Sequence, residues 1–325
     1  MGTHGRKKGL ATDRTRRWLI GSGAAFATLG GLGYMAYRYA GGWIRRIAAD
    51  NSMPTEPPLY FPNPKQWPDK GLYAAWLGHS TVLIKADGFT ILTDPILGEK
   101  AGIDFYLFTI GIKRIVASPI TANDLPPIDL ILSSHAHMDH LDTASLRSLE
   151  NKRTQMVMAT ETSDLIRPTR YGKVTEMRWG QTVQSGPASV KAFEVNHWGA
   201  RMRTDTYRGY NGYTVEVNGR RILFAGDTAL TDNFRSLKDR RGYDLAIMPI
   251  GAYNPWIRYH CNPEQAFRMG NDAGAEFLLP VHHQTFRLSN EPPLEPIERF
   301  LDAAVTLGNP DRVGWTTIGQ EFRLS

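Results

Sequence analysis

The feature that most constrains this chain is a cluster of metal-binding side chains directly after an apolar run. Residues 128–132 are hydrophobic enough to form a buried strand. A His-x-His-x-Asp-His pattern follows, made up of His135, His137, Asp139 and His140. The first two histidines stand two apart, so their imidazoles face the same way in an extended chain, and the last two residues lie on the turn into a helix. Imidazole and carboxylate ligands without thiolates suit zinc.

Four ligands in one segment cannot complete two metal sites, and other predicted strands supply more. The additional candidates, each directly beyond an apolar run, are His197, Asp227 and His282. Gly226 gives the backbone freedom for the turn that presents Asp227. One carboxylate can offer an oxygen to each of two metals, which makes Asp227 the predicted bridge. On position alone, His283 is an alternative to His282.

From Gly71 onward, short β-rich runs alternate with helical stretches. Strands are expected over 74–77, 81–86, 89–93, 128–132, 190–195, 213–217, 221–225, 245–250 and 277–281, and helices over 142–150, 233–238, 263–272 and 296–307. Asp87-Gly88 and Asn218-Gly219 mark two hairpins, and the Asp that follows each hairpin stands thirteen residues after a Thr. This shared layout indicates an internal duplication. We predict an α/β fold in which helices cover the outer faces of two sheets and the ligands gather beyond the strand ends.

The first 46 residues carry much of the net charge of +6. An uncharged run over 18–37 follows six Lys and Arg residues and precedes three. Twenty residues can span a hydrocarbon core, and Arg16-Arg17 resembles a twin-arginine signal. Because the heavier positive charge precedes the run and no A-x-A cleavage site follows, we predict an uncleaved membrane anchor with an extracytoplasmic domain. The alternative is a packed N-terminal helix on a cytoplasmic enzyme.

These patterns divide the chain into three parts. Residues 1–50 form the basic segment with the predicted anchor helix, and residues 51–70, with six prolines, are predicted to be a linker. Residues 71–325 form the globular domain. The single cysteine, Cys261, excludes an intramolecular disulfide, and we expect it to be a small buried residue and not a nucleophile.

Several motifs over roughly 72–292 resemble the metallo-β-lactamase superfamily, and within it the branch of N-acyl-phosphatidylethanolamine-hydrolysing phospholipase D. Besides the histidine cluster they are Trp76-Leu77-Gly78-His79-Ser80-Thr81, Leu92-Thr93-Asp94-Pro95, Leu125-Pro126-Pro127-Ile128-Asp129, His197-Trp198, Gly226-Asp227-Thr228, Gly251-Ala252-Tyr253, His260-Cys261-Asn262-Pro263-Glu264-Gln265-Ala266, Thr285-Phe286 and Asn290-Glu291-Pro292. The chain departs from the family at His283-Gln284, where the family usually has Trp-Gly, and at 210–213, where it tends to be rich in tryptophan. Both departures concern residues expected to contact the substrate and not the metal ligands.

The resemblance implies a four-layered αββα sandwich that holds two zinc ions. It places His135, His137 and His197 on the first metal, Asp139, His140 and His282 on the second, and Asp227 between them. It also implies that His260 lies at the active site. When the chain is aligned with the family motif, His282 and not His283 falls on the position of the metal ligand. Replacing His283 with alanine should then alter substrate affinity more than metal content.

Other residues are expected near this site. His79 and Asp94 are predicted to orient ligands and the loop that carries them. Four aromatic residues could either line an acyl-accepting groove or belong to the core, and the sequence does not distinguish these roles. They are Trp198, Tyr253, Trp256 and Tyr259.

The predicted chemistry is hydrolysis. Two zinc ions that share a solvent molecule lower its pKa towards neutrality, and the resulting hydroxide can attack phosphorus in line. Asp139 would orient this nucleophile, and His260 would stabilise developing charge or protonate the leaving alkoxide. The resemblance implies an N-acyl-phosphatidylethanolamine or a related lipid phosphodiester as substrate, and the anchor agrees with a membrane surface as partner.

Three other functions stay open. A metal-dependent lactonase would use the same hydroxide on a carbonyl. A metal-dependent ribonuclease shares the phosphodiester chemistry, but the domain has no separate basic stretch for RNA, so no nucleic-acid partner is expected. The third is a non-catalytic metal-binding or redox module.

Overall fold

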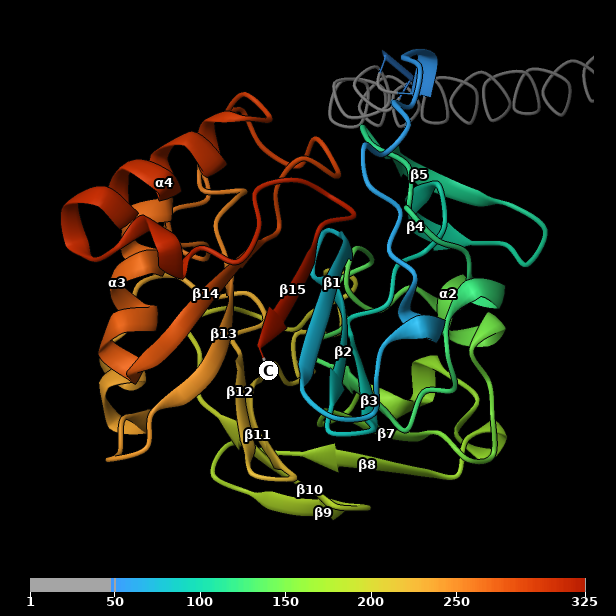
Figure 1. Ribbon diagram of the computed structural model, residues 1–325. Coiled ribbons are helices and arrows are strands. Elements are labelled where there is room, and N and C mark those ends of the chain that lie inside the picture. Colours follow the sequence, from blue (N-terminus) through green and yellow to red (C-terminus); the bar gives the residue numbers. More distant parts are fainter. Residues whose placement is uncertain (1–47, 50, 325) are drawn as a thin grey trace, which may run out of the picture. The chain divides into compact units, whose positions relative to one another are not determined.

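A computed structural model describes residues 48–49 and 51–324 (Figure 1). One compact unit spans Pro54–Ser325. Its principal elements are β1 (Leu72–Gly78), β2 (Thr81–Ala86), β3 (Phe89–Thr93), β4 (Lys100–Asp104), β5 (Thr109–Lys113), β6 (Leu130–Ser133), α2 (Thr143–Ser148), β7 (Gln155–Ala159), β8 (Lys173–Met177), β9 (Thr182–Ser185), β10 (Ala188–Phe193), β11 (Gly212–Val217), β12 (Arg220–Phe224), the 3-10 helix η5 (Asp232–Leu237), β13 (Tyr243–Pro249), α3 (Pro263–Ala273), β14 (Ala275–Val281), α4 (Glu295–Leu307) and β15 (Glu321–Leu324).

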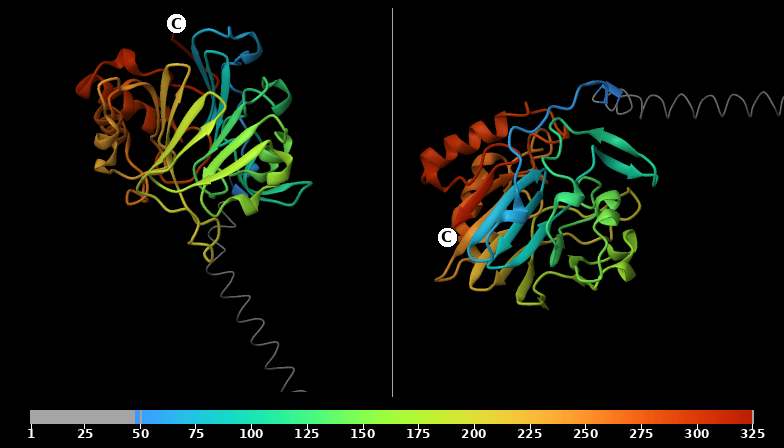
Figure 2. Two further views of the ribbon diagram at one scale, coloured as in Figure 1. Left: turned by 90° about the horizontal axis from the view of Figure 1, so that it is seen from below. Right: turned by 45° about the vertical axis from the view of Figure 1, so that its right-hand side comes forward.

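Two large sheets form the centre of the domain. Their strand orders are β15-β1-β2-β3-β6-β7-β8 and β14-β13-β12-β11-β10-β9, and β4 and β5 make a separate hairpin. The largest hydrophobic cluster contains side chains from both sheets, including Trp76 and Phe224. A second cluster includes side chains of α3 and α4, and a third includes Leu146 of α2. The orange and red helices α3 and α4 lie on one side of the two sheets and the green α2 on the other (Figures 1 and 2). This is the four-layered αββα sandwich that the family resemblance implied.

The predicted strands and helices largely form where the sequence placed them. Each of the nine strands appears with its ends shifted by no more than a few residues, and α3 begins at Pro263 behind an Asn262 cap whose side chain accepts from the Gln265 N–H. The expected helix over 233–238 is instead the 3-10 helix η5. The sequence also missed β15, which is only four residues long and pairs with β1 at the edge of its sheet.

Both predicted hairpins form, and they continue in the same way. Asp87-Gly88 and Asn218-Gly219 all have positive φ, as the two central residues of a type I′ turn require. The second strand of each hairpin then pairs in parallel with the next strand of its sheet, β3 with β6 and β12 with β13. The repeated layout in the sequence thus corresponds to a repeated topology.

The proline-rich segment lies against the domain. Glu56 forms a β-bridge with Val116, and the Trp67 indole is buried and donates its Nε1–H to Glu321 Oε1 at 2.7 Å. The anchor predicted over 18–37 lies outside the described residues. Within the part of the chain that the structure describes, no helix has the length and apolarity needed to cross a membrane.

Parallel strands carry the candidate ligands to one region. β3 and β6 run parallel in one sheet, and β12, β13 and β14 run parallel in the other. The carboxyl ends of parallel strands meet at the same sheet edge. The loops after β6, β12 and β14 carry His135, Asp227 and His282, and the sandwich brings these two edges together.

Candidate metal centre

The three histidines assigned to the first metal converge through their ring nitrogens. His135 Nε2 lies 2.8 Å from His137 Nδ1, and His197 Nε2 lies 3.3 Å from the same nitrogen. The Nδ1–H of His197 donates to the carbonyl of Tyr259 at 2.8 Å, because a carbonyl can only accept. This fixes the tautomer of His197 and leaves a lone pair on Nε2, as metal binding requires.

The second predicted group also assembles. Asp139 Oδ2 lies 3.6 Å from His140 Nε2 and 3.7 Å from His282 Nε2. His79 joins them, with its Nε2 2.8 Å from the same carboxylate oxygen. The ligand atoms of these four residues all lie within 4.8 Å of one another.

Asp227 lies between the two groups. Its Oδ2 is 3.0 Å from His282 Nε2 and 3.1 Å from His140 Nε2 in the second group, and 3.8 Å from His197 Nε2 in the first. The structure therefore brings together all seven residues that the sequence proposed as ligands.

The donor chemistry of this cluster fits a bound cation. His140 donates its Nδ1–H to Asp94 at 2.7 Å, and its Nε2 faces an Asp227 oxygen at 3.1 Å. Burial opposes the charged form of His140, but Asp227 and Asp139 outweigh it and hold the pKa of His140 well above its ordinary value, so this position favours a positive charge, either a proton on Nε2 or a metal ion in its place. In addition, His140 Nε2, His282 Nε2 and Asp227 Oδ1 are buried without a hydrogen-bond partner. Buried polar atoms of this kind need an explanation, and a metal ion supplies one.

The electrostatics point the same way. Burial lowers the pKa of His135 and His197 well below the ordinary histidine value, so both imidazoles are neutral, which is the form that binds metal. For Asp227, burial opposes the charged form, but His140 and His282 outweigh it and hold the pKa of Asp227 well below its ordinary value. Asp227 therefore stays an anion inside the protein and favours a positive charge beside it.

Asp94 and His79 have the orienting contacts that the sequence predicted. Asp94 is fully buried and accepts from the Ser134 N–H at 2.7 Å as well as from His140. Ser134 Oγ contacts both Asp94 and His135 Nδ1. Ser134 could not be recognised from the sequence, because a serine between a strand and a histidine belongs to no pattern of its own.

Two glycines allow backbone approaches that a side chain would block. Gly226 has a φ of +60°, and a Cβ there would lie 2.8 Å from Ser134 Cβ. At Gly251 a Cβ would lie 2.0 Å from the carbonyl oxygen of His282. Gly226 thus permits the turn that presents Asp227, and Gly251 lets the loop after β13 pass directly beside His282.

His260 lies at the edge of the centre, as the resemblance implied. Its Nδ1 is 3.7 Å from Asp227 Oδ2 and has no hydrogen-bond partner. Burial lowers the pKa of His260 to about 4. The neighbouring Cys261 is buried, and its Sγ donates to the carbonyl of Pro249 at 3.2 Å; burial raises its thiol pKa. Cys261 is therefore the small buried residue that we expected.

His283 does not have the role expected for it. Its ring lies on Trp76, with ring centroids 4.5 Å apart, and both ring nitrogens are buried. His282 follows the last residue of β14 in a left-handed conformation, with a φ of 66°, and its ring faces Asp227, whereas the ring of His283 packs into the core. His283 does not line the pocket at the centre, so an effect on substrate affinity is not expected.

A pocket of about 340 Å³ opens onto the centre. It is lined by His137, Met138, Asp139, Trp198, Arg201, Asp227, Ala252, Trp256, His260 and Leu288. Of the four aromatic residues considered for a groove, Trp198 and Trp256 line it. Tyr253 does not, because it is buried and donates its hydroxyl to Glu295 at 2.7 Å.

Arg201 is the pocket residue that the sequence missed. Its Nη1 donates to the carbonyls of Ala136 and Leu141, at 3.1 Å and 2.8 Å, so the guanidinium is fixed against the loop that carries the histidine cluster. It stands in a segment with several arginines and no recognisable motif, so only the fold shows which one lies in the pocket.

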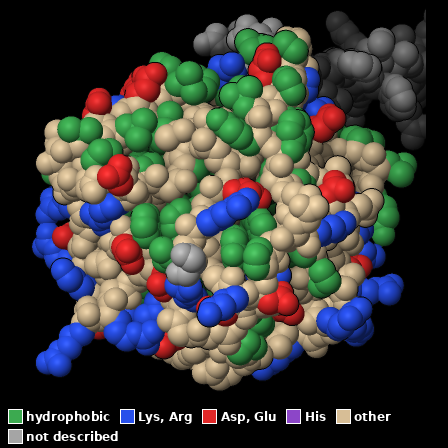
Figure 3. Space-filling view, in the orientation of Figure 1, with side chains coloured by type: hydrophobic (Ala, Val, Ile, Leu, Met, Phe, Trp, Pro, Cys, Tyr) green, Lys and Arg blue, Asp and Glu red, His purple; other side chains and the backbone are tan. Residues whose placement is uncertain are grey.

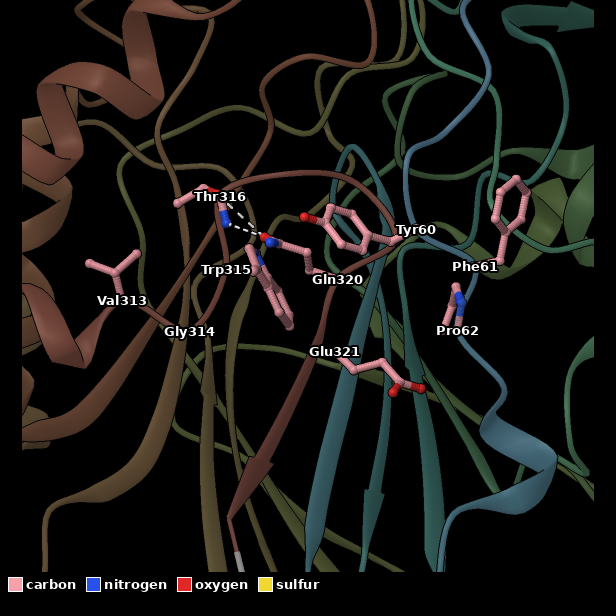
Figure 4. Close-up of a pocket in the computed structure, with 10 residues that line it drawn as sticks. Tyr60, Phe61, Pro62, Val313, Gly314, Trp315, Thr316, Gln320 and Glu321 are labelled. Carbon is pink, nitrogen blue, oxygen red and sulfur yellow. Dashed lines mark hydrogen bonds between the residues drawn. The ribbon is translucent and has the colours of Figure 1, made fainter.

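A larger hollow of about 490 Å³ lies elsewhere, between residues 60–62 and 313–321 (Figure 4). Its lining contains the aromatic residues Tyr60, Phe61 and Trp315 but no histidine, and Glu321 is its only carboxylate. The chemistry of the side chains, and not the size of the cavity, therefore identifies the functional site.

Comparisons with known proteins agree with this geometry. The family model of the beta-lactamase superfamily domain matches residues 90–283. A Mycobacterium tuberculosis protein of unknown function is 32% identical over 262 residues, 78% of this chain and 70% of that one. The N-acyl-phosphatidylethanolamine-hydrolyzing phospholipase D 1 of Caenorhabditis elegans is 31% identical over 250 residues, 71% of this chain and 69% of that one. An isothiocyanate hydrolase from Delia radicum gut bacteria shares the fold, with a TM-score of 0.61, 16% identity, and coverage of 78% of this chain and 99% of that one.

Proposed function

The chain belongs to the metallo-β-lactamase superfamily of metal-dependent hydrolases, and from this premise we propose that it is a dinuclear zinc phosphodiesterase of phospholipase D type. Its substrate is an N-acyl-phosphatidylethanolamine or a related lipid phosphodiester. The observation that carries the proposal is the position of Asp227, whose Oδ2 lies within 3.8 Å of ring nitrogens from both histidine groups. A carboxylate shared in this way suits two metals a few ångströms apart.

The seven residues of the cluster would hold the metals in two sets. His135, His137 and His197 would bind one ion and Asp139, His140 and His282 the other, with Asp227 shared between them. Bound metals supply a solvent nucleophile with a lowered pKa and polarise a phosphoryl oxygen. Nitrogen and oxygen ligands without sulfur fit zinc.

Two residues of the chain are assigned catalytic roles. Asp139 accepts a hydrogen bond from His79, which fixes the carboxylate so that it can orient the nucleophile. His260 lines the pocket with a ring nitrogen that lacks a partner within the domain. In the neutral tautomer with hydrogen on Nδ1, this atom would donate to the charge that develops on the leaving oxygen; to protonate the leaving alkoxide, the ring would first take up the proton that the attacking solvent molecule releases.

The pocket supports a substrate that is both anionic and apolar. Arg201 adds a fixed positive charge beside the metal ligands, as a phosphodiester requires. Trp198 and Trp256 supply apolar surface at the same pocket, and both are partly exposed at its mouth. The similarity to a phospholipase D that hydrolyses N-acyl-phosphatidylethanolamine supports a lipid phosphodiester over a soluble one.

The proposal is tested by assaying purified, zinc-loaded protein on three substrate classes. We expect hydrolysis of N-acyl-phosphatidylethanolamine to phosphatidate and an N-acylethanolamine, with little turnover of lactones or single-stranded RNA. His135→Ala serves as the matched inactive control, because it removes one ligand of the first set. Turnover of a lactone without turnover of any phosphodiester would reject the phosphodiesterase in favour of a lactonase.

A further inference from the structure

The hairpin of β4 and β5 ends in an apolar tip. The tip consists of exposed hydrophobic side chains, namely Ile103, Phe105, Tyr106, Leu107, Phe108 and Ile110. Leu107 at the turn is 91% exposed. The hairpin projects from the body of the domain, and hydrophobic side chains line that edge of the surface (Figures 1 and 3). A contiguous apolar patch of this kind marks a surface that is covered in function.

The tip has a fixed shape. The rings of Phe105 and Phe108 stack with centroids 5.3 Å apart, and the Phe105 N–H donates to the Phe108 carbonyl at 2.9 Å. From α2, the Arg147 guanidinium lies 4.2 Å from the centroid of the Tyr106 ring and donates to Asp104 at 2.6 Å. The tip is therefore presented as a preformed apolar projection, and its only carboxylate is neutralised by Arg147.

The base of the same hairpin is basic. Lys100 and Lys113 stand directly opposite one another in the β4–β5 ladder, so both side chains leave the same face. A strand rises about 3.4 Å per residue, so Lys100 lies about 14 Å from Asp104 along β4, on the side away from the tip. An apolar tip with cationic groups behind it matches the layers of a bilayer, in which anionic headgroups overlie the acyl chains.

The hairpin is packed beside the metal pocket. Ile112 of β5 packs with Phe286 and Leu288 in one hydrophobic cluster, and Leu288 also lines the pocket at the metal centre. Trp256, at the mouth of that pocket, is 48% exposed. A membrane that receives the tip would therefore lie close to the entrance of the site.

We propose that the β4–β5 hairpin inserts its apolar tip into a lipid bilayer that contains anionic phospholipids, and so holds the metal pocket at the membrane surface. The inference deepens the proposed function by naming the surface through which the enzyme reaches a lipid substrate. A protein partner or a second copy of the chain would need no cationic base behind the tip, and each is an outcome that the experiment below separates.

The test uses full-length protein with a fluorophore at the tip. Leu107→Cys provides the attachment point, and the native Cys261 is only 1% exposed, so an environment-sensitive maleimide dye reacts at the introduced thiol. Val305→Cys on α4, 68% exposed in the native protein, is the matched control. With vesicles of phosphatidylethanolamine and phosphatidylglycerol, we expect a blue shift and quenching by brominated lipids at position 107 only. Protein that binds vesicles without a shift at 107, or a shift that depends on protein concentration without vesicles, would overturn the proposal.

A second variant links docking to turnover. Leu107→Ser combined with Phe108→Ser should lower hydrolysis of N-acyl-phosphatidylethanolamine in vesicles by on the order of tenfold, because much of the apolar surface of the tip is lost. Turnover of the soluble bis(p-nitrophenyl) phosphate should not change. Equal loss on both substrates, or no loss on vesicles, would contradict the docking role. If neither protein hydrolyses any phosphodiester, the proposed function fails, and the fluorescence result still decides the docking.

Discussion

Replacing Asp94 with asparagine tests whether the residues around the ligands set the metal affinity. Asp94 accepts hydrogen bonds only: one oxygen from the Ser134 N–H at 2.7 Å, the other from His140 Nδ1 at 2.7 Å and from the Ser134 hydroxyl. In Asp94→Asn one oxygen becomes an NH2 group. If that group faces His140, the imidazole must accept at Nδ1 and carry its proton on Nε2, the nitrogen aimed at Asp227. If it faces the backbone, it meets the N–H of Ser134, which cannot change its role.

Either orientation costs metal affinity. Loss of a hydrogen bond to a ligating histidine weakens metal binding by about 10- to 100-fold, which corresponds to roughly 1.4–2.8 kcal/mol. Because Asp94 contacts His140 and the Ser134 beside His135, we expect the lower affinity chiefly at the site that contains His140. The change in side-chain volume is negligible, so the fold should survive.

Zinc affinity is measured by competition with a chromogenic chelator. Asp142→Asn is the matched control, because Asp142 is a buried carboxylate that caps α2 by accepting from the Ser145 N–H at 2.9 Å. Asparagine caps a helix as well as aspartate does, so this control should bind zinc like the native protein. A folded Asp94→Asn protein that holds two zinc ions as tightly as the control would refute the reasoning.

Four further predictions follow from the structure. His282→Ala should remove one metal by elemental analysis, whereas His283→Ala should keep both and lower the thermal midpoint, since that ring packs on Trp76; the opposite result would mean that the assignment is off by one residue. His260→Gln should lower kcat by about 10²- to 10⁴-fold with the metal content unchanged, and an unaltered kcat would remove its catalytic role. Arg208→Met should cost roughly 1–3 kcal/mol in denaturant unfolding, because the largely buried Asp205 loses its ion pair with Arg208 and keeps only the Met202 N–H as a partner. Deleting residues 1–53 should move the protein from the membrane fraction to the fraction released by a high-salt wash, and full-length protein in the cytosol would exclude the anchor.

The candidate metal centre was predictable because its histidine and aspartate residues stand directly after apolar runs that form strands. The apolar runs give the strands, and the parallel pairing of β3 with β6 and of β12 with β13 and β14 brings their ends to one edge. Histidine and carboxylate side chains that gather at one sheet edge in this way indicate a metal site, because they have no other reason to cluster. Local patterns therefore place His135 and Asp227 with no knowledge of the rest of the fold, whereas the choice of His282 over His283 required alignment with the family motif.

Features that depend on contacts between distant segments were not predictable. Arg201 lies in the pocket because two loop carbonyls hold it there, and no local pattern distinguishes it from other arginines in its segment. The β4–β5 hairpin was missed because Gly102 and Gly111 lower its strand propensity and its apolar turn lacks the usual turn residues. The direction of His283 was not predictable either, because β14 ends at Val281 and the left-handed conformation of His282 breaks the alternation of the strand.

The backbone around the centre shows that the ligands are arranged by the fold itself. His79, Asp94 and His282 have φ values of 50°, 31° and 66°, a region that costs a residue with a Cβ about 1–3 kcal/mol. Each is held there by a bond from a neighbouring segment. The His282 N–H donates to the His79 carbonyl at 3.0 Å, the Asp94 N–H to the Leu132 carbonyl at 2.9 Å, and the His79 N–H to Thr285 Oγ1 at 2.6 Å.

None of these three bonds involves a metal ligand atom, so they persist whether or not a cation is bound. The strain is offset by the buried strands β1, β3 and β14, which these residues follow. The stability of the sandwich therefore keeps the backbone of these three residues in a strained conformation. Their side chains converge independently of a bound cation. A cation that binds there would have little ordering entropy to overcome, because the fold has already brought together side chains from many segments.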